Sequence, residues 1–190
     1  MADEFQLVGY LRLLAEHGVD YLIVGGVGGR IQGAATTTGD IDIMPDPSPA
    51  NLDRLAAALS GRSTEKKEER STVYETHGTV DPMEFRTADV SSYRTVYGLI
   101  DVLMELPGVG PFDAVRRNAR RYQSDDIVLI VASIDDIITS KETAGRSKDW
   151  RAMDASYQAR DHLRDHPDAY EVSEDALDAS DGDADADAAE

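Results

Sequence analysis

The 190-residue sequence contains no cysteine, and none of its apolar runs approaches the length of a membrane span. Without cysteine the chain can form neither a disulfide framework nor a thiolate metal site, and this composition suits a reducing compartment. A helix needs about 20 apolar residues to cross a bilayer, and the acidic start Met1-Ala2-Asp3-Glu4 lacks the basic region of a signal peptide. We therefore expect a cytoplasmic protein with no membrane partner.

Basic residues are also scarce, because 19 Lys and Arg stand against 37 Asp and Glu, a net charge of −18. Such a charge argues against nucleic-acid binding. Half of it is local: residues 171–190 hold nine acidic and no basic residues, so the remainder carries −9. The alternating Asp and Ala of Asp181–Asp187 cannot bury apolar surface. This tail is predicted to be disordered, with solubility as its simplest role.

Two common phosphate-binding motifs are missing from the sequence. A dinucleotide fingerprint that starts at Gly26-Val27-Gly28 would need glycine where Ile31 stands. No Gly-Lys-Ser/Thr segment follows, which excludes a P-loop. The four histidines are scattered, and neither a Ser/His/Asp arrangement nor a histidine metal site can be proposed from them.

A different combination of glycines and aspartates is present. Gly25-Gly26 closes an apolar run at 21–24, and Asp40 and Asp42 lie one residue apart in the next apolar segment. Residues i and i+2 of a strand share a face, so the two carboxylates would lie side by side and repel each other unless a cation or proton lies between them. Mg²⁺ prefers carboxylate and phosphate oxygens. The aspartate pair alone could be a solvated strand end, and the glycine pair alone could be a turn. The two together, in this order along the chain, are a much more specific signal than either part.

This combination resembles the signature of the polymerase-beta-like nucleotidyltransferase superfamily, most closely its small AbiEii/MenT toxin type. The similar segments are Val24-Gly25-Gly26 and Thr38-Gly39-Asp40-Ile41-Asp42-Ile43. The resemblance implies that the glycines approach a triphosphate and that Asp40 and Asp42 hold Mg²⁺. It also implies a third carboxylate from a later strand, for which Asp101 within 98–103 is the candidate.

A second segment, Lys141–Asp149, is similar to the Lys…Ala…Arg-x-Lys-Asp stretch of the same proteins. The resemblance implies that Lys141 reaches the nucleotide from a helix. It adds Arg30, Thr38 and Lys148 as candidate nucleotide contacts. Many relatives place a further aspartate three residues after Lys-Asp, where this chain has Ala152, and the nearest carboxylate is Asp154.

The implied activity is metal-dependent transfer of NMP from an NTP to an acceptor hydroxyl, for which the tRNA 3′ end and an antitoxin partner are expected. Because the chemistry depends on positioning and electrostatics, no Cys or His nucleophile is needed. Three alternatives stay open. In the first, the acceptor is a protein hydroxyl. In the second, the chain binds nucleotide or a partner without turnover. In the third, the chain is an acidic interaction protein that acts through its tail.

The expected fold is α/β (α+β), a small mixed sheet flanked by helices with a helical C-terminal part. Residues 1–168 form the nucleotidyltransferase-like domain, with core motifs in 20–105 and the helical part in 111–168, and residues 169–190 form the acidic tail. The sequence pattern predicts helices at 5–14, 51–59, from 111, from 134 and at 149–162. It predicts strands at 21–24, 41–44, 72–76, 83–86, 98–103 and 126–132. Residues 61–71 are predicted to be a mobile loop. A short helix is expected to carry four arginines: Arg116, Arg117, Arg120 and Arg121.

Overall fold

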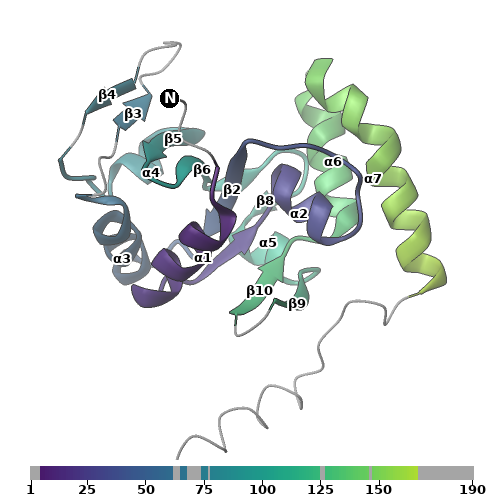
Figure 1. Cartoon of the computed structure of the whole chain (residues 1–190), viewed down its shortest axis with the longest axis horizontal. Coiled ribbons are helices and arrows are strands. Elements are labelled where there is room, and N and C mark those ends of the chain that lie inside the picture. Colours follow the sequence, from purple (N-terminus) through teal and green to yellow (C-terminus); the bar gives the residue numbers. More distant parts are fainter. Residues whose placement is uncertain are drawn as a thin grey trace, which may run out of the picture.

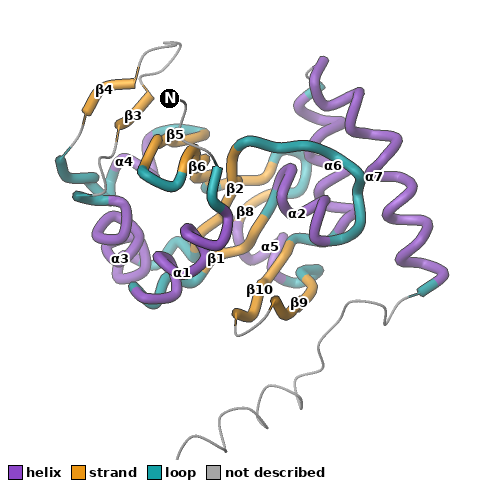
Figure 2. Tube along the Cα trace, viewed as in Figure 1, coloured by secondary structure: helices purple, strands orange, loops and turns teal. Residues whose placement is uncertain are grey.

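The computed structural model describes residues 5–61, 65–67, 74–76, 78–124, 127–145 and 147–166. A mixed sheet lies in the middle, and helices pack around it (Figures 1 and 2). The helices are α1 (Leu7–Glu16), α2 (Gly25–Ile31), α3 (Pro49–Leu59), α4 (Glu84–Thr87), α5 (Phe112–Arg116), α6 (Ile134–Ala144) and α7 (Ser147–Asp165). This arrangement confirms the predicted α/β (α+β) class.

The sheet has eight described strands in the order β4-β3-β5-β6-β2-β1-β10-β9. They are β1 (Tyr21–Ile23), β2 (Asp40–Pro45), β3 (Glu65–Lys67), β4 (Tyr74–Thr76), β5 (Val90–Thr95), β6 (Gly98–Leu103), β9 (Arg120–Ser124) and β10 (Ile127–Val131). The pairs β2–β6 and β1–β10 are parallel and the others are antiparallel. A separate hairpin joins β7 (Glu105–Leu106) to β8 (Gly110–Pro111).

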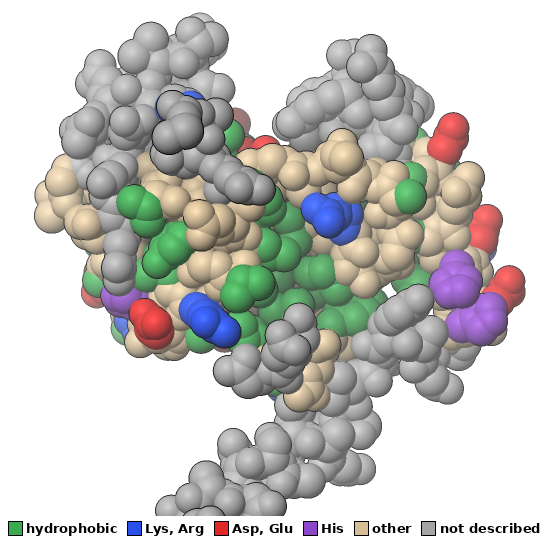
Figure 3. Space-filling model, viewed as in Figure 1, with side chains coloured by type: hydrophobic (Ala, Val, Ile, Leu, Met, Phe, Trp, Pro, Cys, Tyr) green, Lys and Arg blue, Asp and Glu red, His purple; other side chains and the backbone are tan. Residues whose placement is uncertain are grey.

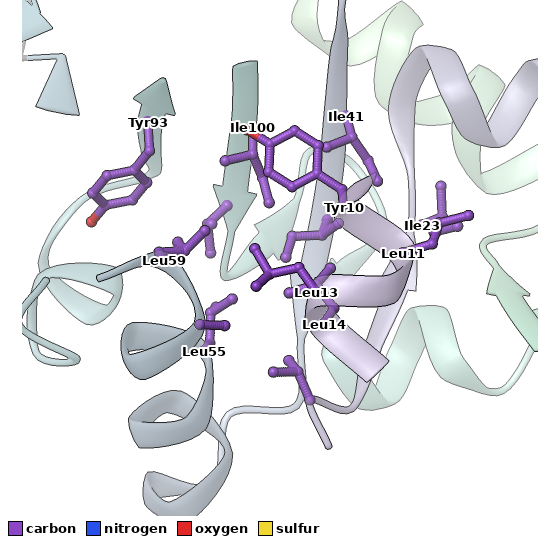
Figure 4. Packing of buried hydrophobic residues seen from close by; sticks show 14 of the residues in the cluster. Tyr10, Leu11, Leu13, Leu14, Ile23, Ile41, Leu55, Leu59, Tyr93 and Ile100 are labelled. Carbon is purple, nitrogen blue, oxygen red and sulfur yellow. The ribbon is translucent and has the colours of Figure 1, made fainter. Parts of the chain in front are cut away.

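Alternation along the central strands divides the core between the two faces of the sheet. Ile23, Ile41 and Ile43 pack with residues of α1 and α3 in one core cluster. Figure 4 shows Tyr10 of α1 beside Ile41 and Ile100 of this cluster. The hydroxyl of Tyr10 donates to the carbonyl of Gly98 at 2.8 Å, which ties α1 to the start of β6.

The opposite face of the sheet carries the second cluster, in which Leu22 and Val24 pack with Phe112 of α5 and Ile137 of α6. A third cluster joins α6 to α7, which lie side by side at one end of the molecule (Figure 1). The sheet is therefore covered by α1 and α3 on one face and by α5 and α6 on the other, and α7 packs outside α6.

Local contacts and glycines set the ends of α1 and α6. Helix α1 ends before Gly18, whose φ of +62° suits the left-handed residue that follows many helices. The hydroxyl of Ser133 accepts a hydrogen bond from the backbone N–H of Asp136 at 3.1 Å and caps α6. Gly145, with φ +59°, ends α6 and leads into α7.

Three local predictions are wrong. The glycines after β1 form the first turn of α2 rather than an open turn, because the backbone N–H of Gly28 already bonds to the carbonyl of Val24 at 3.1 Å. Residues 83–86 are not a strand: Asp81 accepts from the N–H of Met83 at 2.9 Å, and this turn starts α4, whose Phe85 is buried. The segment 65–67, predicted as a loop, pairs with β5 as β3.

The four arginines do not share a helix either. Helix α5 ends at Arg116 with Arg117 as its C-cap residue, whereas Arg120 and Arg121 belong to β9. The strand forms because the segment pairs with β10, with Arg121 opposite Ile130. Predictions for 62–64, 68–73, 77 and the tail 169–190 lie outside the described residues.

The face seen in Figure 3 has hydrophobic side chains gathered between α1 and α2, with few charged groups among the described residues. Within the described part of the chain, no helix combines the length and apolar character that a membrane span requires.

Candidate functional site

A cleft of about 190 Å³ opens where the ends of β1, β2 and β6 meet α2 and α6. One part of its wall is apolar and comes from Val24, Leu103, Leu106 and Ile137. The rest is polar, and the polar lining residues come from five separate segments. They are Gly25, Gly26, Thr36, Thr37, Thr38, Asp40, Asp42, Asp101, Ser140 and Lys141.

The three predicted carboxylates come together here, as the strand register requires. Asp42 on β2 lies opposite Asp101 on the parallel strand β6. Adjacent strands are about 4.8 Å apart, so these two side chains are direct neighbours on one face. Asp40 lies two residues before Asp42 and shares that face. The residues between them, such as Ile41, are fully buried on the other face.

The face of the sheet that carries the three carboxylates continues from β6 onto β5. Ser92 pairs with Asp101, and Arg94 pairs with Leu99, which in turn pairs with Asp40. Ser92 is half-buried and Arg94 is exposed. The second core cluster covers this face over β1 and β2 but includes no residue of β5. The carboxylates therefore lie at the border between the covered and the accessible part of the face.

The two glycines allow the chain to pass close to the carboxylates. A Cβ atom on Gly25 would lie 2.0 Å from Oδ2 of Asp42, and the φ of Gly25 is +58°. A Cβ atom on Gly26 would lie 2.8 Å from Oγ1 of Thr38. The backbone N–H of Gly26 donates to Oδ2 of Asp42 at 3.4 Å. Both positions thus require glycine, and the backbone donor faces the place where negative charge gathers.

Threonines line the side of the cleft formed by the connector between α2 and β2. Oγ1 of Thr38 donates to Oδ1 of Asp40 at 2.5 Å, which orients that carboxylate. Oγ1 of Thr36 is buried and has no hydrogen-bond partner among the described residues. A buried hydroxyl without a partner costs about 1–3 kcal/mol, so a ligand that supplied one would gain that energy. The sequence motif predicted Thr38 but gave no signal for Thr36 or Thr37.

Helix α2 is itself anchored by a buried glutamine. Nε2 of Gln32, which is 1% exposed, donates to the carbonyl of Gly28 at 3.0 Å and to that of Ala132 at 2.9 Å. The second bond links α2 to the segment between β10 and α6. It fixes the glycine-rich turn against the helix that carries Lys141.

Lys141, the predicted nucleotide contact, lines the cleft, and its Nζ donates to Oγ of Ser156 on α7 at 3.1 Å. Arg30 is exposed at the end of α2 and is not among the residues that line the cleft. Asp154 is exposed and also lies outside the lining. The side chain of Lys148 lies outside the described part of the structure.

The donor set suits a hard divalent cation. Asp40, Asp42 and Asp101 offer carboxylate oxygens, the ligands that Mg²⁺ prefers. Within the described residues, no three acidic or histidine side chains already lie close enough to surround an ion. Oxygens of Asp40 and Asp42 instead accept hydrogen bonds from Thr38 and Gly26.

Comparisons with known proteins show which solved structures have a similar fold. No family model matches the sequence, and no curated protein matches it significantly. The structure is similar to the lincosamide antibiotic adenylyltransferase LnuA with bound lincomycin, with a TM-score of 0.56, 14% identity, and coverage of 80% of this chain and 95% of that chain. It is also similar to a candidate nucleotidyltransferase from Thermotoga maritima, with a TM-score of 0.45, 13% identity, and coverage of 86% and 98%. The first similarity shows that this chain adopts a nucleotidyltransferase fold.

Proposed function

We propose that the chain is a metal-dependent nucleotidyltransferase that moves NMP from an NTP to an acceptor hydroxyl. The observation that carries this proposal is the convergence of three carboxylates, a close-approach glycine pair and a lysine in one cleft. The pattern fits the chemistry, because a triphosphate needs cations and backbone donors whereas a metal needs carboxylates. The nucleotidyltransferase fold supports the same activity.

Asp40, Asp42 and Asp101 would hold Mg²⁺, which would supply positive charge to offset the negative charge that develops on the phosphates. The N–H of Gly26 is a donor for a phosphate oxygen, since it points toward the carboxylate edge of the cleft. Lys141 contributes a compact positive charge to the triphosphate. Thr38 holds Asp40 in one orientation through its hydroxyl.

In the transfer step, the acceptor oxygen forms a bond to the α-phosphorus, and the bond from that phosphorus to the bridging oxygen of pyrophosphate breaks. The proton of the acceptor hydroxyl passes to a carboxylate oxygen. We assign this role to Asp101, because its strand borders the accessible face over β5, from which an acceptor can approach. The apolar wall formed by Leu103, Leu106 and Ile137 limits water on the other side.

For the acceptor we propose the 3′ end of tRNA, in a toxin that is neutralised by an antitoxin. Support comes from the motif resemblance alone. Because Arg116 and Arg117 lie at the end of α5 while Arg120 and Arg121 lie on β9, they do not form the single helical surface expected from the sequence. Protein hydroxyls are the alternative acceptor, and nucleotide binding without turnover is the alternative activity.

One incubation tests activity and acceptor together. The protein is mixed with Mg²⁺, each α-labelled NTP in turn, and total tRNA, no acceptor, or lincomycin, the ligand bound to LnuA. The proposal predicts label in tRNA for at least one NTP. Label in the protein itself would move the acceptor to a protein hydroxyl, and label in lincomycin would move it to a small molecule. Unchanged NTP in every mixture, with nucleotide still bound, would leave the non-catalytic alternative.

A further inference from the structure

Lys141 of the cleft is hydrogen-bonded to a residue of the neighbouring helix α7. Nζ of Lys141 on α6 donates to Oγ of Ser156 on α7 at 3.1 Å. Ser156 is 0% exposed, and it lies 15 residues beyond the lysine. None of the described side chains of α7, at 153–165, is among those that line the cleft. The contact therefore connects the cleft to a buried residue of a neighbouring helix.

The surroundings of Ser156 are apolar. Met153 and Ala159, three residues before and after it on the same helical face, are each 4% exposed and pack against Ile134 and Ile138 of α6. A hydroxyl in such a seam is costly unless it is hydrogen-bonded, and alanine would fill the same space without that cost. The hydrogen bond with Lys141 helps to offset this cost.

The hydrogen bond to Ser156 also affects the charge state and the rotamer freedom of the Lys141 side chain. An ammonium group has three donors, and the bond to Ser156 uses one of them. A hydrogen bond to the charged form favours that form. Lysine loses rotamer freedom when it binds a phosphate, and an anchored side chain has already lost part of it.

We propose that Ser156 is a positioning residue that holds the ammonium group of Lys141 ready for the triphosphate of the NTP. This inference rests on the proposed function and adds α7 to the nucleotide-binding apparatus. Ser156 acts through Lys141. Replacement of Ser156 should therefore weaken binding of the triphosphate group, whereas binding of the nucleoside part of the substrate should not change.

A double-mutant cycle tests it. Calorimetry measures the Kd of the Mg²⁺ complex of the NTP that wild type binds most tightly, for wild type, Ser156→Ala, Lys141→Ala and the double variant. The expected loss for Ser156→Ala is about tenfold, the low end for a hydrogen bond to a charged group. In the Lys141→Ala background the same change should have no further effect, because the partner is gone. The Kd of the corresponding nucleoside should not change.

Ser60→Ala is the matched control. Its hydroxyl donates to the carbonyl of Ala56 at 2.7 Å and accepts from the N–H of Val80 at 3.0 Å, at the end of α3 and outside the cleft lining. It removes the same group and is expected to lower the thermal midpoint without changing nucleotide affinity. Ser156→Cys enters the cycle if Ser156→Ala fails to fold, since a thiol of similar shape is a weak acceptor and should behave like alanine.

Three results would overturn the inference. Equal or tighter NTP binding by Ser156→Ala would show that the serine does not hold the lysine for binding. A loss that persists in full without Lys141 would make its role purely structural. Failure of the wild type to bind any NTP would refute the proposed function as well, whereas a defect in Lys141→Ala alone would refute only the role of Ser156.

Discussion

Replacement of Asp42 by asparagine is the most informative perturbation of the cleft. The side chain keeps its shape, and an amide oxygen can still accept the hydrogen bond that Oδ2 of Asp42 receives from Gly26. What is lost is one negative charge beside Asp101, its neighbour on β6. Removing one of two adjacent like charges should leave the thermal midpoint unchanged or slightly higher.

Activity should respond very differently from stability. Loss of a group that stabilises charge in the transition state typically costs about 10²–10³-fold, or roughly 3–4 kcal/mol. Asp42→Asn is therefore expected to lower kcat/KM for transfer by at least about 10²-fold. The assay is label transfer from the preferred NTP at a series of Mg²⁺ concentrations, with the thermal midpoint measured on the same samples.

Asp89→Asn is the matched control for the change of charge. Asp89 is exposed in the bend before β5 and does not line the cleft, so its replacement should leave transfer unchanged. Transfer by a folded Asp42→Asn protein within a few fold of wild type would refute the assignment of Asp42 to the metal and the reaction.

Three further predictions concern the triphosphate, the glycine turn and the tail. Lys141→Ala should weaken binding of all four NTPs alike, because a phosphate contact carries no base information. Lys141→Arg should restore little binding, since a planar guanidinium does not replace a compact ammonium group. A loss of affinity for only some of the four NTPs in binding assays would contradict this. Gly25→Ala should abolish transfer and lower the free energy of unfolding by at least about 1 kcal/mol, because the new Cβ would meet Oδ2 of Asp42 and because the φ of this residue is +58°. A near-normal denaturant midpoint and transfer rate would be inconsistent with that contact. Deleting residues 171–190 should leave the thermal midpoint unchanged and raise tRNA affinity modestly at low salt, because nine acidic residues are removed; equal affinity in a filter-binding titration would limit the tail to solubility.

The sequence predicts which aspartates lie together in the cleft, because their placement depends on local patterns. Apolar residues alternate with Asp40 and Asp42 at the period of a strand, so the shared face follows from geometry. Asp101 requires one further step, the pairing of β6 with β2, and the similar apolar-Asp-apolar pattern supplied it. The glycine pair was placed correctly, although its role as the first turn of α2 was not foreseen.

What the sequence did not reveal depends on contacts between distant segments. In the sequence, Ser156 is an ordinary helical serine. Its contact with Lys141 depends on the packing of α7 on α6. Thr36 becomes notable only when its hydroxyl is buried beside the cleft. The spacing of Arg116 and Arg120 fits a helix, but pairing of β9 with β10 overrides that local preference.

The central claim is that the α-phosphate, not the γ-phosphate, is transferred. The direct measurement is a parallel incubation of the protein, Mg²⁺ and the acceptor panel with an NTP labelled at the α- or the γ-position. The account predicts that α-label enters the acceptor while γ-label is released as pyrophosphate in equal amount, and that both signals fall at least about 10²-fold in Asp42→Asn. Transfer of γ-label to the acceptor, release of γ-label as inorganic phosphate, or α-label transfer that persists in Asp42→Asn would contradict it.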